Sequence, residues 1–284
     1  MTLCLAWRIK NEISLMADSR LTSDLSIVTN NANKIFTIHV NIFRGTVQKR
    51  QSIFSAKYGL CFAGSYLNGS YLANTISELT SEIFVDENFE PTYDLICEVA
   101  FFVYENVTKH LGEIHREDGF SEAFFIGSCP KSGISEITKF SVSIVDELRF
   151  YMTKVLLNDN IEYLGSANAI NKAREIANKI DQNFNHFDLM SEIIQDSKIV
   201  DVGGCIQYGC ILGGNFRIYG IYDVEEHLNE ENNMKEYRGI RLFRSLPMNW
   251  EDSRIKQLNC KIGIISMAPF SEKMQELNKQ NRKK

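Results

Sequence analysis

Three residues near the start of the chain could together form a nucleophilic centre. Asp18 lies sixteen residues after Thr2, and Lys34 lies sixteen residues after Asp18. Once Met1 is removed, Thr2 carries both a hydroxyl nucleophile and a free α-amine, whose reference pKa of about 7.7–8.0 allows it to accept a proton near neutral pH. We therefore expect Thr2 to be a nucleophile that supplies its own base, and we expect methionine aminopeptidase to remove Met1 before this small residue.

Lys34 and Asp18 could supply the charges that such a nucleophile needs. A positive charge at Lys34 would lower the pKa of the Thr2 hydroxyl and amine, and each pKa unit corresponds to about 1.4 kcal/mol. Asp18 would pair with Lys34, fixing the direction of the lysine and keeping it charged in a partly desolvated site. The alternatives are a surface lysine and a turn aspartate at a strand end. For Arg20, beside Asp18, we expect a structural role in the turn.

The order of these residues resembles that of the proteasome β-type subunits and their bacterial relatives, which are N-terminal nucleophile (Ntn) hydrolases. Beside Thr2, the resemblance is carried by residues 17–20 (Ala-Asp-Ser-Arg) with Thr22, and by residues 33–35 (Asn-Lys-Ile). Later landmarks are residues 62–65 (Phe-Ala-Gly-Ser), 165–167 (Gly-Ser-Ala) and 203–204 (Gly-Gly). They occur in the family's order and span residues 2–204, about 70% of the chain.

The resemblance implies roles for further residues. Gly64 would donate its backbone N–H to the developing oxyanion, and Ser166 would support the Thr2 amine. The alternatives are a plain turn glycine and a helix N-cap serine. The positions that match the family's pocket for the substrate side chain are Leu21, Thr22, Ala32, Phe36 and Phe62, and they imply a preference for apolar or small residues.

The chain departs from the family just before the glycine pair at 203–204. Active eukaryotic-type subunits carry an Asp and a Ser there, whereas this chain has Ile199 and Val202. Asp201 is displaced in sequence but could substitute for the missing carboxylate. The departure concerns the groups that would set the pKa of the Thr2 amine, and the nucleophile itself is still present.

Composition narrows the classes of function. The 284 residues are 44% hydrophobic and 24% charged, as in an ordinary globular protein. The net charge of −5 argues against a nucleic-acid partner, and no apolar run approaches the roughly 18 residues of a membrane span. Seven scattered cysteines without C-x-x-C spacing favour reduced thiols in a cytoplasmic protein and argue against a zinc site. We expect no metal and no cofactor.

Hydrophobic patterns predict alternating blocks of strands and helices. Expected strands are 2–8, 12–17, 34–40, 59–63, 122–126, 134–144, 148–156, 205–212, 216–221 and 261–267. Expected helices are 67–84, 92–114, 167–180 and 187–196. This order fits an α+β chain, and the resemblance implies a four-layer αββα sandwich of two antiparallel sheets flanked by helices, the Ntn-hydrolase fold. With no repeat and no linker, residues 1–284 are expected to form a single domain.

Three segments fall outside that pattern. Thirty residues separate Lys34 from Gly64, whereas the family joins these landmarks by a short turn. Residues 41–57 are therefore a predicted insertion, which could be a lid, a specificity loop or an assembly contact. Residues 222–258 are charge-rich and are expected to decorate the core, and 271–284 is expected to be a polar tail.

These features together predict a cytoplasmic threonine-type endopeptidase that cleaves polypeptides through an acyl-Thr2 ester. The resemblance implies a homo-oligomer, often supplied with substrate by an ATP-dependent unfoldase. The composition argues against nucleic acid or a membrane as partner. Two alternatives stay open. One is a small-molecule amidase of the same superfamily, and the other is a catalytically silent scaffold subunit with the proteasome fold.

Overall fold

The computed structural model describes most of the first 222 residues and three short strands beyond them. The described residues are 2–9, 12–23, 26–144, 147–155, 161–179, 186–222, 234–237, 240–243 and 267–269. The predicted tail at 271–284 lies outside them, as do most of the predicted decoration at 222–258 and nearly all of the predicted strand at 261–267.

The first strands of the chain belong to an eight-stranded sheet, which is antiparallel except for one pair. Its path is β11 (Glu162–Gly165), β1 (Leu3–Ile9), β2 (Glu12–Ala17), β12 (Gln207–Leu212), β13 (Asn215–Tyr222), β14 (Met234–Tyr237) and β15 (Ile240–Phe243), with β16 (Met267–Pro269) parallel to β13.

A second sheet has six strands, and a small sheet has two. The six-stranded order is β10 (Leu148–Lys154), β9 (Ser135–Ile144), β8 (Ser121–Ser128), β6 (Lys49–Gly64), β5 (Ile35–Thr46) and β7 (Ile83–Val85). The two-stranded sheet is the hairpin of β3 (Leu21–Ser23) and β4 (Ser26–Thr29).

Among the described residues, four α-helices and one short 3₁₀ helix accompany the sheets. They are α1 (Tyr66–Thr80), α2 (Tyr93–His115), η1 (Arg116–Gly119), α3 (Ala167–Lys179) and α4 (His186–Gln195). Side-chain oxygens cap the first two, because Ser65 accepts from the N–H of Asn68 and Thr92 from that of Leu95. The predicted helix at 67–84 is too long, since α1 ends at Thr80 and Ile83–Val85 instead pair with β5.

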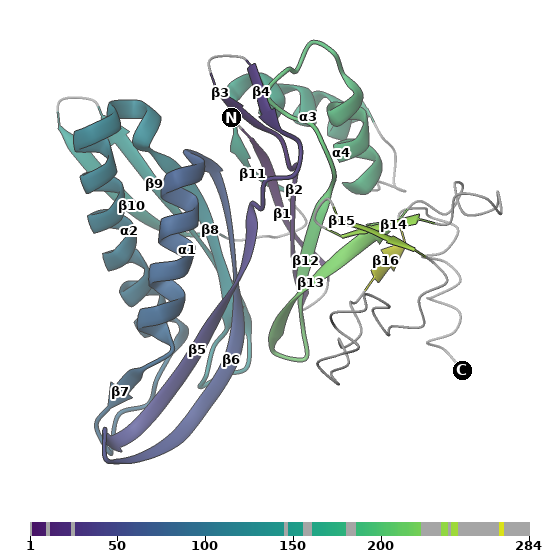
Figure 1. Cartoon of the computed structure of the whole chain (residues 1–284). Helices are drawn as coiled ribbons and strands as arrows, with labels where there is room; N and C mark the ends of the chain where they lie inside the picture. Colours follow the sequence, from purple (N-terminus) through teal and green to yellow (C-terminus); the bar gives the residue numbers. More distant parts are fainter. Residues whose placement is uncertain are drawn as a thin grey trace, which may run out of the picture.

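Three buried hydrophobic clusters show how these elements pack. The first joins α1 and α2 to the six-stranded sheet, and it includes Ile76, Ile96 and Phe125. The second lies between the two large sheets, and the third joins β1 and β2 to α3 and α4. Helices therefore cover the outer side of each sheet, while the inner sides face each other (Figure 1). The chain is a mixed α/β structure.

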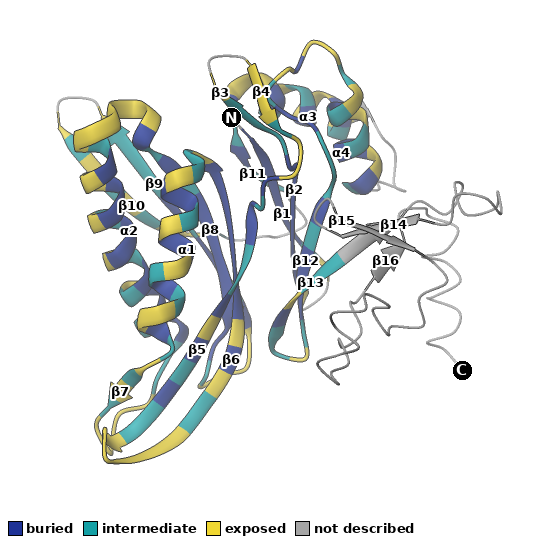
Figure 2. Ribbon diagram, in the orientation of Figure 1, coloured by how far each residue is buried: buried dark blue, intermediate teal, exposed yellow. Residues whose placement is uncertain are grey.

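In strand β1, the first five residues, 3–7, are all apolar and all buried. Successive side chains of a strand point to opposite faces. Leu3 and Leu5 belong to the cluster under α3 and α4, whereas Cys4 and Ala6 belong to the cluster between the sheets. Because both faces are buried, the sequence reads as a continuous hydrophobic segment rather than an alternating one (Figure 2).

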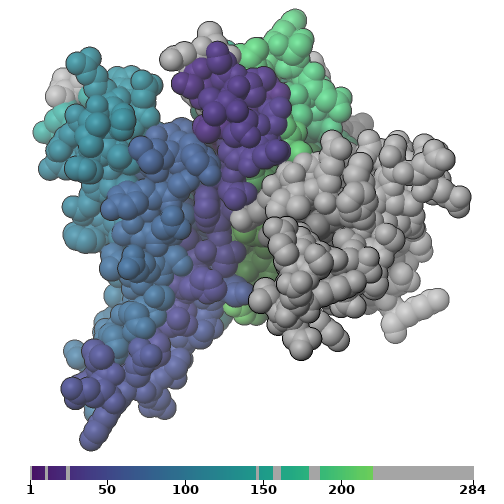
Figure 3. Space-filling model, viewed as in Figure 1, coloured from purple at the N-terminus to yellow at the C-terminus, as the bar shows by residue number. Residues whose placement is uncertain are grey.

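The predicted insertion at 41–57 forms the distal part of one long hairpin. Strands β5 and β6 pair from Ile35–Cys61 to Thr46–Lys49, with one register shift between Ile42 and Phe43. The predicted strands 34–40 and 59–63 were therefore too short. The tip projects from the body of the molecule (Figures 1 and 3) and is exposed at residues 45–52 (Figure 2). The segment was hard to recognise as strand because little of it has a buried face to impose a hydrophobic period.

His186, the first residue of α4, provides a test of how this helix packs against β1. Its ring stacks on Trp7 with centroids 4.2 Å apart, and burial lowers the pKa of His186 to about 4. The unfolded chain, with a His pKa of about 6.5, takes up a proton that the folded chain does not. Folding stability should therefore fall as pH drops from about 6.5 towards 4, by up to about 3 kcal/mol. Urea unfolding at pH 7.5 and 5 should show part of this loss in the wild type and a smaller one in His186→Phe; equal losses would refute it.

Candidate active site

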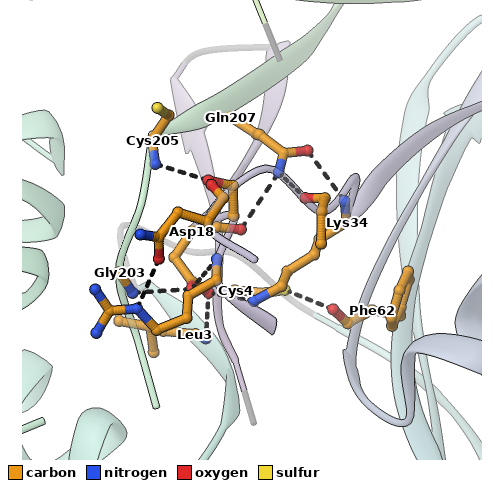
Figure 4. A network of polar contacts seen from close by, with 12 residues as sticks. Leu3, Cys4, Asp18, Lys34, Phe62, Gly203, Cys205 and Gln207 are labelled. Carbon is orange, nitrogen blue, oxygen red and sulfur yellow. Dashed lines mark hydrogen bonds and ion pairs between the residues drawn. The ribbon is translucent and has the colours of Figure 1, made fainter. Parts of the chain in front are cut away.

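Asp18 is the centre of a buried network at the end of β2. One carboxylate oxygen, Oδ1, accepts from Lys34 Nζ at 2.9 Å and from the backbone N–H of Leu3 at 3.0 Å. The other, Oδ2, accepts from the backbone N–H groups of Arg20 and Gly203, both at 3.0 Å. Four donors thus converge on this fully buried carboxylate (Figure 4).

The Asp18–Lys34 pair joins the end of β2, in the eight-stranded sheet, to the start of β5, in the six-stranded sheet. Asp18 directly follows β2, and Lys34 directly precedes β5. Their side chains are only 0% and 2% exposed. Removing both charges from water is costly, and this cost is offset only when the pair is close and further hydrogen bonds are made. The four donors to Asp18 meet that requirement.

Thr2 is held beside this pair through its main chain. Its carbonyl accepts from the N–H of Ser166 at 3.3 Å, and the peptide group that it shares with Leu3 donates to the same Asp18 oxygen that binds Lys34. The Thr2 residue is 2% exposed. The structure therefore brings together Thr2, Asp18 and Lys34, which the sequence places in three separate segments.

Ser166 lies next to Thr2 and caps a helix at the same time. Its hydroxyl oxygen accepts from the N–H of Ala169 at 3.3 Å, in the first turn of α3. Its own N–H binds the Thr2 carbonyl. The capping role is therefore present, and support of a Thr2 amine by the Ser166 hydroxyl stays a prediction.

Gly64 ends strand β6 near the network. Two residues earlier, Phe62 donates its N–H to the Lys34 carbonyl at 3.2 Å, so the end of β6 runs alongside the start of β5. Gly64 has a φ of +113°, and a Cβ here would lie 2.5 Å from the Phe120 carbonyl oxygen. Glycine is thus needed for the turn, and the use of its N–H for an oxyanion stays a prediction.

The five predicted pocket residues lie in three places, of which the hairpin and the core hold two residues each. Leu21 and Thr22 are half-buried on the β3–β4 hairpin. Phe62 is 1% exposed in the cluster beneath α1, and the half-buried Phe36 stacks with it at a centroid distance of 6.0 Å. Core packing accounts for Phe62, and a substrate pocket formed by all five stays a prediction.

Ala32, the fifth predicted pocket residue, lies apart from the other four. It is 5% exposed, its N–H donates to the Ser19 carbonyl at 2.8 Å, and its carbonyl accepts from Gln207 at 2.6 Å. Its main chain therefore belongs to the network around Asp18.

The loop before β12 anchors Asp18 through its first glycine. Gly203 donates to Asp18 and accepts from the Ser19 N–H at 3.1 Å. Ile199 and Val202 are buried in the cluster with α3 and α4. Among the described contacts Asp201 makes no hydrogen bond or ion pair, so its predicted substitution for the missing carboxylate is not supported by a contact.

Arg20 ties the same loop to the turn after β2. Its guanidinium donates to Asn30 Oδ1 at 2.9 Å and to the Val200 carbonyl at 3.1 Å. A Cβ on Gly203 would overlap this guanidinium, so the loop approaches closely because residue 203 has no side chain. These contacts agree with the structural role expected for Arg20.

Cys4 is a second potential nucleophile close to Thr2, and its environment argues against that use. Its Sγ donates to the Phe62 carbonyl at 3.1 Å, and the residue is fully buried. Burial raises the pKa of the Cys4 thiol well above its ordinary value. Because the thiolate is the nucleophilic form, Cys4 is a core residue.

Gly165 provides a test of how tightly Thr2 is positioned. Its φ is +140°, and a Cβ there would overlap the Thr2 carbonyl oxygen. Gly165→Ala should lower stability by roughly 1–3 kcal/mol and displace Thr2. The control is Gly133→Ala, because Gly133 also has a positive φ, +70°, but open space around it. Equal losses of stability in the two variants, measured by urea unfolding, would show that only backbone strain matters at Gly165.

Other kinds of site receive no support from the described residues. No group of three or more potential metal ligands comes together in the part of the chain that the structure describes. None of its described helices is long and apolar enough to cross a membrane. Cys4, Cys61, Cys97, Cys129 and Cys210 are buried free thiols.

Comparisons with known proteins add no family assignment. No model of a known protein family matches the chain, and no curated protein matches it either. The resemblance to Ntn hydrolases therefore rests on the residues and on their order in the sequence.

Proposed function

We propose that this protein is a threonine-type Ntn hydrolase that cleaves peptide bonds. The observation that carries the proposal is the 2.9 Å ion pair between Lys34 and Asp18, buried where the Asp18 oxygen also binds the peptide group following Thr2. Replacing a buried ion pair by well-packed apolar residues is often neutral or stabilising by about 1–4 kcal/mol. A buried ion pair placed beside a threonine therefore favours a chemical role over a purely structural one.

The proposed reaction begins after removal of Met1. The Thr2 hydroxyl oxygen attacks the carbonyl carbon of the peptide bond while its proton passes to the Thr2 α-amine, directly or through water. Collapse of the tetrahedral intermediate breaks the C–N bond, and the departing amine takes the proton. The resulting acyl-Thr2 ester is then hydrolysed by water, which regenerates the hydroxyl.

Lys34, Asp18 and Gly64 have distinct roles in this proposal. The Lys34 ammonium lowers the pKa of the hydroxyl and of the amine, and Asp18 fixes the direction of the ammonium. The Gly64 N–H would stabilise the oxyanion. Ser166 would hold the amine, because the chain has apolar residues where the family carries its further amine ligands.

The architecture and the setting of the reaction are also inferences. The packing of helices outside two facing sheets supports assignment to the four-layer αββα Ntn-hydrolase fold in one domain. This fold would position Thr2 for the proposed reaction. Polypeptide substrates, a homo-oligomeric assembly, an ATP-dependent unfoldase and a cytoplasmic location follow from the resemblance alone. No cofactor is required by the proposed steps.

Hydrolysis of fluorogenic peptide amides tests the proposal. Peptides with small or apolar residues before the amide should be cleaved, and a burst of the first product should precede steady turnover because an acyl-enzyme accumulates. Cleavage of small non-peptide amides without cleavage of peptides would instead support the amidase alternative. Lack of turnover on every amide by the assembled protein would contradict the hydrolase proposal.

One observation favours the scaffold alternative. Ile199 and Val202 are buried among apolar side chains, so two family positions that would tune the amine carry no polar group. A scaffold subunit needs none there. Retention of Thr2, Asp18 and Lys34 in one network favours the hydrolase, and the same peptide assay separates the two functions.

A further inference from the structure

Gln207 makes a set of contacts that the proposed reaction does not itself explain. It is the first residue of β12, lies opposite Ala17 in the register with β2, and is 4% exposed. Its Oε1 accepts from the backbone N–H of Lys34 at 3.0 Å. Its Nε2 donates to the Ala32 carbonyl at 2.6 Å and to the Asp18 carbonyl at 3.4 Å (Figure 4).

These contacts join Asp18 and Lys34 a second time. The side chains of the two residues meet in the ion pair, and the Gln207 carboxamide connects their main chains. One planar group therefore spans the end of β2 and the start of β5. A buried amide left with unmet hydrogen bonds would be costly, and here both of its polar atoms are used.

The main chain of Lys34 needs such support because it lies just before β5. Its carbonyl accepts from the Phe62 N–H at 3.2 Å, in the direction of the six-stranded sheet. Its N–H is taken by Gln207, from the eight-stranded sheet. The base of a lysine side chain with four rotatable methylenes is thus fixed from two sides, which limits where its ammonium can lie.

We propose that Gln207 is a positioning residue that fixes the point from which the Lys34 side chain reaches Asp18 and the surroundings of Thr2. The structural part of this inference concerns Lys34 alone. Its consequence for catalysis rests on the proposed function. The alternative is an amide that only holds the two sheets together.

The first experiment measures the acylation rate of Lys34 and does not require the protein to have enzymatic activity. Native protein is treated briefly with acetic anhydride, and acylation of each lysine is followed by mass spectrometry. Lys131 and Lys154, whose side chains are 61% and 54% exposed, serve as internal standards, and wild-type Lys34 should be protected because its side chain is 2% exposed and ion-paired. In Gln207→Leu the acylation rate of Lys34 relative to the standards should rise at least about tenfold, since an amide clamp is lost.

Asn215 offers a matched control elsewhere between the same sheets. Its Oδ1 accepts from the backbone N–H of Lys57 at 2.9 Å, so it is also a side-chain amide that clamps a main-chain donor. Asn215→Leu should leave the protection of Lys34 unchanged. If Gln207→Leu does not fold, Gln207→Asn, which is shorter by one methylene, should show a smaller increase in the same direction.

The second experiment follows the pH dependence of Thr2 modification by a threonine-directed epoxyketone. A displaced Lys34 lowers the pKa of the Thr2 amine less, so the curve for a Gln207 variant should move to higher pH. Its maximal rate should fall roughly 10- to 100-fold, as expected for a misplaced catalytic group. A residue that only supports the core would lower the melting temperature and leave the pH curve in place.

The outcomes distinguish this inference from the proposed function. Unchanged Lys34 protection in Gln207→Leu and Gln207→Asn would overturn it, as would an unshifted pH curve. Increased Lys34 acylation in a protein whose wild type takes no epoxyketone would support positioning of the ion pair by Gln207 and contradict the hydrolase function.

Discussion

Replacement of Thr2 by alanine should abolish amide hydrolysis while the protein still folds. The variant loses the only atom that attacks the substrate carbonyl, so kcat/KM should fall by at least about a thousandfold. Thr2 is buried, but its contacts with Ser166 and, through the next peptide group, with Asp18 use the main chain, which alanine retains. The measurement is hydrolysis of a fluorogenic peptide, with circular dichroism and melting temperature as checks on folding.

Thr2→Ser is the matched control for this variant. Serine keeps the hydroxyl and the α-amine and still permits removal of Met1, so it should retain measurable hydrolysis. Full activity in Thr2→Ala would show that another group is the nucleophile. Loss of folding in Thr2→Ala together with a folded, inactive Thr2→Ser would assign Thr2 to the core rather than to catalysis.

The second large effect is expected when the carboxylate of Asp18 is neutralised. Asp18→Asn removes the partner of a lysine whose side chain is 2% exposed and leaves its charge buried. Breaking a buried pair in this way costs about 3–5 kcal/mol. It also releases the Lys34 ammonium, so hydrolysis should be lost as well. Urea unfolding and peptide hydrolysis measure the two effects separately.

A double variant separates stability from chemistry at this pair. Asp18→Asn combined with Lys34→Met removes both charges, so much of the lost stability should return because no unpaired ion stays buried. Hydrolysis should not return, since the positive charge beside Thr2 is absent. Recovery of activity together with stability would mean that the pair is structural and would contradict a catalytic role for Lys34.

Several strands and helices could be predicted from the sequence because the hydrophobic period is strong in those segments. The strand expected at 12–17 and the helix expected at 92–114 correspond closely to β2 and α2. The β3–β4 hairpin and the distal part of the β5–β6 hairpin were not predicted as strands. Both are largely exposed, so neither has a buried face that would impose an alternating pattern of apolar and polar residues.

At the site, the sequence allowed us to predict several of the polar residues, but not all of the contacts that hold them. Asp18 and Lys34 could be predicted as partners because their chemistry is complementary and their order matches a known family. Gln207 was missed, since the Lys34 N–H that it binds lies 173 residues earlier in the chain and depends on the pairing of β12 with β2. Its one visible sign was a polar residue within the apolar segment predicted as strand 205–212.

The central claim is that Thr2 is a free and activated nucleophile. Intact-mass spectrometry of the purified protein, with and without a threonine-directed epoxyketone, tests it most directly. We expect a mass lower by one methionine residue and a single adduct that maps to Thr2, and we expect no adduct in Lys34→Met. Retained Met1, or a processed chain that takes no adduct at Thr2 in its assembled form, would contradict the threonine mechanism.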